Sequence, residues 1–235
     1  MKRWLWDSKR RIYVDASGVK LPKRALARDL DEYIESISDG MALQVAEYTA
    51  GRISTAALFN FLEREVRLLH AASGSIAYGG LEQMDATKWE RIEQRVFQEL
   101  SYLTQFRGDV AQAAALATPE NPLSAEGIAN RAGLYAEAAY SEYMVQMVER
   151  EADEGVTLGR RICESDGASC EECVAAATEE FIPLEDIEEI GTLQCMNNCR
   201  CEIEFSIEGQ EFRTSDIFQG VVGGQDQYGG DVTIQ

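Results

Sequence analysis

Histidine is almost absent from this chain, since His70 is the single one among 235 residues. An HExxH metalloprotease motif and a histidine-rich hydrolytic metal site are therefore excluded. His70 follows Leu68 and Leu69 in a predicted helix, where a structural role is more common than a catalytic one. Because a Walker loop and a G-x-G-x-x-G turn are absent as well, we expect that the protein is not an enzyme.

Long apolar runs are also lacking. No uncharged apolar segment reaches about 18 residues, and the N-terminal MKRWLWDSKRR has no apolar stretch behind its charges, which predicts neither a membrane span nor a signal peptide. We therefore expect synthesis in a reducing cytoplasm. In that compartment, clustered cysteines bind metal more often than they form disulfides.

Positive charge is scarce, with 22 lysines and arginines against 41 aspartates and glutamates, and it is unevenly distributed. Residues 1–28 hold nine of these cations against two aspartates, so the rest of the chain is strongly acidic. An acidic surface is repelled by nucleic-acid phosphates. General coating of DNA or RNA by the whole protein is therefore not expected.

The basic N-terminal segment, residues 1–23, interleaves Trp4, Trp6 and Tyr13 with its cations. Two interpretations are open. The segment is either an arm whose aromatic and basic side chains contact an acidic protein surface or a nucleic acid, or an edge strand that covers the protein's own core. An arm laid on a neighbouring subunit would satisfy both interpretations.

Residues 24–155 are predicted to form a helical body, because apolar residues recur there at helical spacing. The stretch 25–51 predicts one helix or two, depending on whether Gly40 interrupts it. A loop is expected at 73–80, and the turn-forming TPENP marks a further boundary. The expected helix starts are Ser54 or Thr55, a capping box of Thr87 with Glu90, and Ser124 before a long helix that ends near Gly155.

After residue 155 the pattern changes to short elements, with an acidic loop, EEFIPLEDIEEIG, and a strand candidate, CEIEFSIEGQEFR. The last stretch is rich in glycine. The sequence thus predicts a mainly α protein whose C-terminal part holds a small zinc knuckle and a short β element. Its expected parts are a basic aromatic arm (1–23), a helical body (24–155), a cysteine-rich zinc-binding region (156–210) and an extended Gly-rich tail (211–235).

The six cysteines include two closely spaced pairs, C-x-x-C at Cys170 and Cys173 and C-x-x-x-C at Cys195 and Cys199. A tetrahedral zinc ion requires two such turns, each offering two thiolates, and a region with few large apolar side chains needs such a staple. We therefore predict one zinc ion held by Cys170, Cys173, Cys195 and Cys199. The cations expected to offset the thiolate charge are Arg160, Arg161 and Arg200.

The remaining cysteines leave alternatives open. Cys201 follows Cys199 by two residues and is the first substitute ligand, whereas Cys163 stands farther out. Two or three disulfides are the alternative to a metal.

Several stretches together carry a family resemblance: WLWDSKRRIYVDASG, SYLTQFRGDVAQ, NRAGLYAEAAYSEYM, and the cysteine block that closes with GTLQCMNNCRCEI. They are similar to the head morphogenesis or minor capsid proteins of tailed bacteriophages, a family related to the F-like minor head protein of phage Mu. The resemblance extends over about residues 4–205, and the cysteine block is its one sharp motif.

Within that block, Cys170 and Cys173 match the family's first pair, and Cys195, Cys199 and Cys201 match its second element. Cys195 stands where a histidine is common in the family, and Cys163 is an addition. These departures put the ligand set, not metal binding itself, in question.

The resemblance implies a structural virion protein that docks, in multiple copies, on portal or capsid subunits during phage head assembly, and it does not imply an enzyme. The alternative is a zinc-dependent nucleic-acid-binding or regulatory module. The acidic residues around the cysteines disfavour phosphate contact there. Any contact with nucleic acid is therefore expected through the arm alone, and no membrane is expected as a partner.

Overall fold

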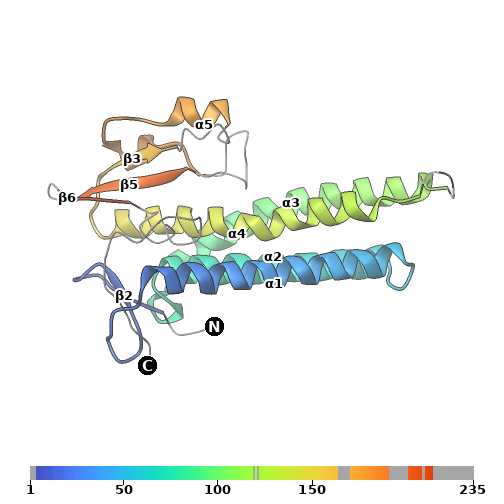
Figure 1. Ribbon diagram of the computed structural model, residues 1–235, viewed down its shortest axis with the longest axis horizontal. Helices are drawn as coiled ribbons and strands as arrows, with labels where there is room; N and C mark the ends of the chain where they lie inside the picture. Colours follow the sequence, from blue (N-terminus) through green and yellow to red (C-terminus); the bar gives the residue numbers. More distant parts are fainter. Residues whose placement is uncertain are drawn as a thin grey trace, which may run out of the picture.

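A bundle of four long helices is the main feature of the computed structural model, which describes residues 4–118, 120, 122–163, 170–190, 201–207 and 210–213. The helices are α1 (Lys23–Thr49), α2 (Thr55–Ala77), α3 (Ala86–Leu116) and α4 (Ala125–Asp153). α4 packs against both α1 and α2, and α3 packs mainly against α2 (Figure 1). The prediction of a mainly α fold is confirmed. None of the described helices has the length and apolar character of a membrane span.

Side-chain caps mark where three of the four long helices begin. Ser54 and Ser124 cap α2 and α4 as predicted, each accepting a hydrogen bond from a backbone amide three residues later. The predicted capping box of Thr87 with Glu90 is wrong, because Asp85 caps α3 instead. Aspartate is a better N-cap than threonine, and its charge also complements the positive end of the helix dipole.

Gly40, predicted as a possible helix break, and Gly74, predicted to lie in a loop, both lie inside helices. α1 runs unbroken through Gly40, so the first helical stretch is one helix. α2 continues to Ala77, so the loop predicted at 73–80 shrinks to the last residues of that range. A Cβ atom on Gly74 would lie 2.4 Å from the Cδ1 atom of Ile92, so this glycine permits close approach of α3.

The core of the bundle has two parts. The part near the α1–α2 turn is made by all four helices and includes Leu58, Leu62, Phe106 and Ala136. None of the described cysteines belongs to it. Among the described residues, this half of the bundle is therefore held together mainly by helix-to-helix packing.

The second part of the core lies at the other end of the bundle and joins segments that the sequence analysis kept apart. Trp4 and Tyr13 come from the predicted arm, Met144 from the body, and Cys173 and Cys201 from the cysteine-rich region. All five are buried. The predicted boundaries near residues 23 and 155 therefore do not separate independent cores.

The N-terminal segment forms a two-stranded antiparallel hairpin of β1 (Leu5–Asp7) and β2 (Ile12–Val14), in which Trp6 pairs with Tyr13. Gly79 and Gly80 have positive φ angles and let the hairpin approach the end of α2, since a Cβ on Gly79 would lie 2.1 Å from the Cβ of Trp6. Of the two interpretations of this segment, the structure supports the strand that covers the protein's own core.

The cysteine-rich region contains an antiparallel sheet that lies over α4 (Figure 1). Its strand order is β4 (Ile182–Pro183), β3 (Leu158–Ile162), β5 (Glu202–Ile207) and β6 (Gln210–Arg213). The short helix α5 (Glu171–Ala176) and the 3-10 turn η2 (Leu184–Asp186) complete the region, and another such turn, η1 (Leu81–Gln83), follows α2. The predicted C-terminal β element is therefore present.

Candidate functional site

Cys170 and Cys173, the first predicted ligand pair, form a tight turn at the start of α5. Cys170 is the residue before the helix, and its Sγ atom accepts a hydrogen bond from the backbone N–H of Cys173, with an N···S distance of 3.4 Å. The Cys173 side chain is buried in the core, and Cys170 packs against it. One half of the predicted site is thus a turn that backbone hydrogen bonding holds in place.

Arg161 on β3 contacts this turn. Its side chain is 1 % exposed, donates through Nη2 to the Sγ atom of Cys173 at 3.4 Å, and donates through Nη1 to the carbonyl oxygen of Glu188 at 2.8 Å. Because a guanidinium keeps its charge even when buried, it stabilises negative charge on a neighbouring sulfur. The structure therefore brings Arg161, one of the three predicted cations, to a predicted ligand.

The other two cations that were predicted to offset the thiolate charge are Arg160 and Arg200. Arg160 forms an ion pair with Glu204 and stacks on Phe181, with its guanidinium carbon 4.7 Å from the ring centroid. Arg200 lies outside the described residues.

The second predicted ligand pair, Cys195 and Cys199, lies outside the described residues. The two other cysteines, Cys163 and Cys201, approach each other with their Sγ atoms 3.1 Å apart. Within the described ranges, no three histidine, cysteine, aspartate or glutamate side chains gather in a way that could hold a metal ion. The described residues alone therefore do not form a complete metal site.

A buried polar network, which the sequence analysis missed, joins the bundle to the cysteine-rich region. Arg95 on α3 donates through Nε to the fully buried Glu142 at 2.8 Å and forms an ion pair with Glu189, which follows η2. The Nδ1 atom of His70 lies 3.0 Å from the Oε2 atom of Glu142. Burial raises the pKa of nearby Glu99 above its usual value, although the charges of His70 and Arg95 act in the opposite direction.

The sequence feature that could have predicted this network is a polar residue inside an apolar stretch. Glu142 lies within AAYSEYMVQM, and His70 follows two leucines. The contact between His70 Nδ1 and Glu142 Oε2 satisfies one polar atom of each residue, whereas His70 Nε2 and Glu142 Oε1 are buried without a hydrogen-bond partner among the described residues. His70 is therefore an internal residue of the bundle that binds a carboxylate.

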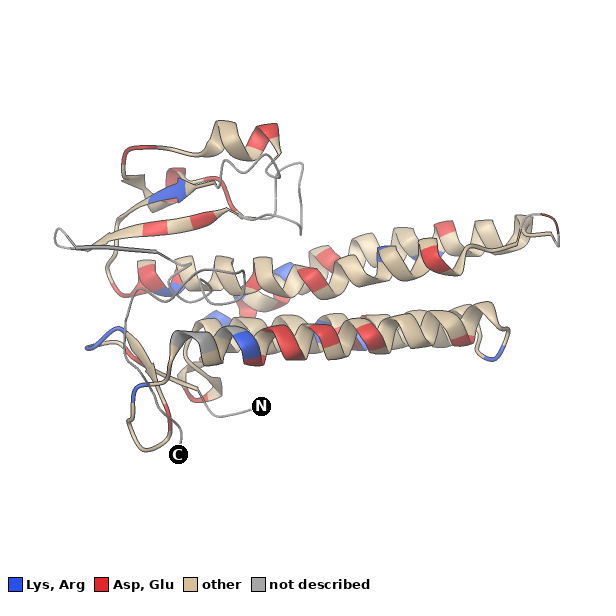
Figure 2. Ribbon diagram, viewed as in Figure 1, with Lys and Arg blue, Asp and Glu red and all other residues tan. Residues whose placement is uncertain are grey.

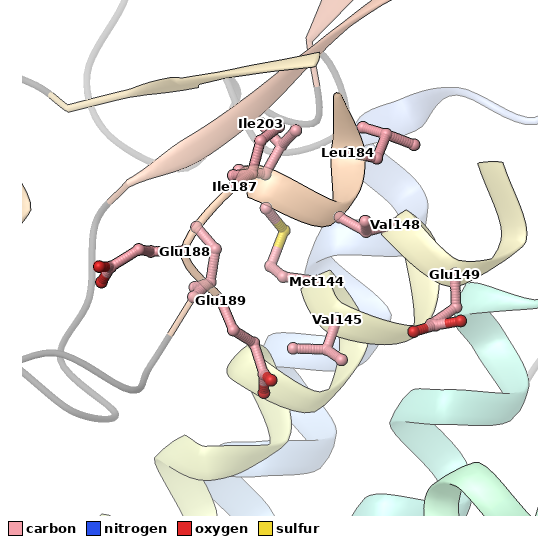
Figure 3. Close-up of a pocket in the computed structure, with 10 residues that line it drawn as sticks. Met144, Val145, Val148, Glu149, Leu184, Ile187, Glu188, Glu189 and Ile203 are labelled. Atoms are coloured by element: carbon pink, nitrogen blue, oxygen red, sulfur yellow. The ribbon is translucent and has the colours of Figure 1, made fainter. Parts of the chain in front are cut away.

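A small cavity of about 150 Å³ lies between α4 and the segment around η2 (Figure 3). Met144, Val148 and Ile203 contribute apolar side chains to its wall. Two carboxylates that line the cavity form ion pairs, Glu149 with Arg91 and Glu189 with Arg95. The cavity is well below the roughly 300 Å³ of a typical ligand pocket, and its described lining residues include no acid–base pair.

The cations of the hairpin divide into buried and exposed ones. Arg11 is half-buried and pairs with Glu151 and Glu154 on α4 or just after it. Lys9 and Arg10 are exposed at the turn of the hairpin, where Arg10 also forms an ion pair with Asp7, and Lys20 is exposed in the loop after β2. Figure 2 shows these positive segments at one end of a molecule whose helices carry many carboxylates.

Comparison with known proteins gives no relative: no family model, no curated protein and no solved structure matches the chain. Two local features remain from which a function can be argued. One is the cysteine turn with its buried arginine, and the other is the exposed positive charge of the hairpin.

Proposed function

We propose that this protein is a structural component of a tailed-bacteriophage virion, a minor capsid or head morphogenesis protein that docks on portal or capsid subunits. The motif resemblance of the sequence is the starting point. A structural observation supports the proposal further. The hairpin buries the aromatic side chains Trp4 and Tyr13 in the core and exposes the basic side chains Lys9 and Arg10 at its turn. Such a feature suits docking on an acidic protein surface better than it suits catalysis.

The aromatic side chains of the hairpin pack into the core of this chain itself. Trp4 is 2 % exposed, and the Nε1 atom of Trp6 donates to Glu154 at 2.6 Å. A preorganised surface loses little conformational entropy when it binds. The contact surface that we assign is therefore Lys9, Arg10 and Lys20, with Val19, which is 60 % exposed, as its apolar element.

The proposal includes one structural zinc ion bound by Cys170, Cys173, Cys195 and Cys199. Two observations favour thiolate ligation: the preformed turn of Cys170 with Cys173, and the buried guanidinium of Arg161 beside the Cys173 sulfur. Zinc would supply four metal–sulfur bonds between two turns and no redox chemistry. Hard carboxylate ligands are a poorer match for such a site, so the neighbouring glutamates are assigned to solvent.

The proposal is tested in the particle itself. Virions and procapsids of the encoding phage are purified, and quantitative mass spectrometry is expected to find this chain at a fixed ratio to the portal protein. Its absence from both particles would overturn the structural assignment. Salt-dependent DNA binding by the purified protein, together with that absence, would favour the nucleic-acid-binding module instead.

A further inference from the structure

Cys163 and Cys201 occupy matching positions on two neighbouring strands. β3 and β5 are antiparallel, with Ile162 opposite Glu202, so Cys163, directly after β3, faces Cys201, directly before β5. Opposed residues of an antiparallel pair have Cα atoms about 4.5–5.5 Å apart. That range lies within the roughly 4.4–6.8 Å that a disulfide spans.

The sulfur atoms themselves are close but not bonded to each other. The Sγ–Sγ distance is 3.1 Å, whereas a disulfide bond is about 2.05 Å long. Two thiolates on one tetrahedral zinc ion, each about 2.3 Å from the metal, are about 3.8 Å apart. The pair is therefore closer than two ligands of one zinc ion and needs only a small movement to form a disulfide.

The two thiols also differ in access to solvent. Cys163 is half-buried, whereas the Cys201 side chain is 0 % exposed. A small oxidant can therefore reach Cys163 first, and Cys201 is then placed to complete the reaction from inside.

We propose that Cys163 and Cys201 are a dithiol pair that a small-molecule disulfide, of the type of oxidised glutathione, converts to a disulfide. The two cysteines are not among the four proposed zinc ligands, and the inference does not depend on the zinc proposal. The product would link the adjoining ends of β3 and β5 covalently, on the face that packs against α4.

The reaction balances as a thiol–disulfide exchange. The Cys163 thiolate attacks one sulfur of oxidised glutathione, forms a mixed disulfide and releases the first glutathione thiolate. Cys201 then attacks the Cys163 sulfur and releases the second glutathione. The two cysteines lose two electrons and two protons, and the glutathione disulfide gains both, leaving two molecules of glutathione.

Trypsin provides a direct test on the full-length wild-type protein. Cleavage after Arg161, Arg200 and Arg213 places Cys201 alone on residues 201–213 and the other five cysteines on residues 162–200. After incubation with oxidised glutathione and alkylation of the remaining thiols, these two peptides are expected to be linked. A second cleavage after glutamate, at Glu164, isolates Cys163 on residues 162–164 and shows whether it is the partner.

Two variants and one metal measurement complete the test. Cys163→Ser and Cys201→Ser should each abolish the linked peptides, while the zinc content before and after oxidation should stay the same. Linked peptides that persist in Cys163→Ser, no linkage in folded wild type, or zinc release in proportion to linkage would each overturn the inference. A wild-type protein that never contains zinc but still forms the linkage would refute the zinc proposal and leave this one standing.

Discussion

The guanidinium of Arg150 stacks on the indole of Trp6, with its central carbon 3.7 Å from the ring centroid. The same guanidinium donates to the hydroxyl of Tyr13 at 2.9 Å and to a backbone carbonyl at the end of α2 at 2.7 Å. The fully buried Glu151 accepts a further hydrogen bond from it. A helix of the bundle and the N-terminal hairpin are thus joined by a buried charged network, and the hairpin is part of the folded core.

Replacement of Arg150 by methionine should destabilise the protein strongly. The change leaves the Glu151 carboxylate buried with one cationic partner fewer, and breaking a buried pair typically costs about 3–5 kcal/mol. Urea denaturation followed by circular dichroism measures the free energy of unfolding. The matched control is Arg107→Met on the exposed face of α3, expected within about 0.5 kcal/mol of wild type. Equal stability of the two variants would show that the network is not a stabilising element.

Removal of the proposed zinc ion should leave most of the helical circular dichroism intact. The core half near the α1–α2 turn includes none of the described cysteines, so its packing does not require the metal. A strong chelator is added to the reduced protein, and the helical signal and the zinc content are followed together. Collapse of the whole helical signal in one step with zinc loss would show that the bundle and the cysteine-rich region fold as one metal-dependent unit.

Cys173→Ser should remove the zinc ion and loosen the region from about residue 163 onward, because it deletes one proposed ligand and the sulfur that Arg161 contacts. Elemental analysis under reducing conditions and limited proteolysis report these two effects. Cys163→Ser is the matched control, and it should keep one zinc ion per chain. Zinc retention in Cys173→Ser, or zinc loss in Cys163→Ser, would require a different ligand set.

Reversal of the exposed hairpin charges should reduce incorporation into phage particles without unfolding the protein. In the triple variant Lys9→Glu, Arg10→Glu and Lys20→Glu, repulsion replaces attraction to an acidic partner, and one like-charge contact at an interface costs several kcal/mol. Truncation of the hairpin is a poorer experiment, because it removes Trp4 and Tyr13 from the core.

Incorporation of the triple variant is measured by quantitative mass spectrometry of purified particles, and a fall of at least tenfold is expected. The control reverses Arg67, an exposed cation in the middle of α2, to glutamate and should be incorporated normally. Normal incorporation of the hairpin variant would place the docking surface elsewhere.

Glu99→Gln should stabilise the protein at neutral pH and have no effect in acid. Burial raises the pKa of the folded-state carboxyl above its unfolded value, so the ionised form costs free energy only in the folded state. Below the unfolded-state pKa this free-energy cost is absent. It grows as the pH rises from the unfolded-state pKa to the raised folded-state pKa, and it is constant at higher pH. The difference in free energy of unfolding between variant and wild type should therefore increase upward from about pH 4.5.

Urea denaturation across this pH range measures that difference. Glu93→Gln, at an exposed position of the same helix, is the control and should follow wild type. A constant difference between Glu99→Gln and wild type at all pH values would show that the effect is not electrostatic.

The sequence by itself determined the helices and much of their boundaries. Caps such as Ser54 and Ser124, and the apolar stripes of 24–155, depend on residues within a few positions of one another, so they can be read along the chain. Even there, the N-cap of α3 is Asp85 and not the predicted Thr87. The two candidate caps are two residues apart, and aspartate has the stronger N-cap preference. The turn at Cys170 and Cys173 also follows from local spacing alone.

Only the tertiary structure decided which residues meet. Trp6 and Glu154 are 148 positions apart in the chain, and Cys163 and Cys201 are 38 apart, yet each pair is in contact. Whether the hairpin tryptophans face a partner or their own core depends on the shape of the bundle end, which no local pattern encodes. The pairing of Cys163 with Cys201 depends on the register of β3 with β5, and that register is set by burial of one face of the sheet against α4.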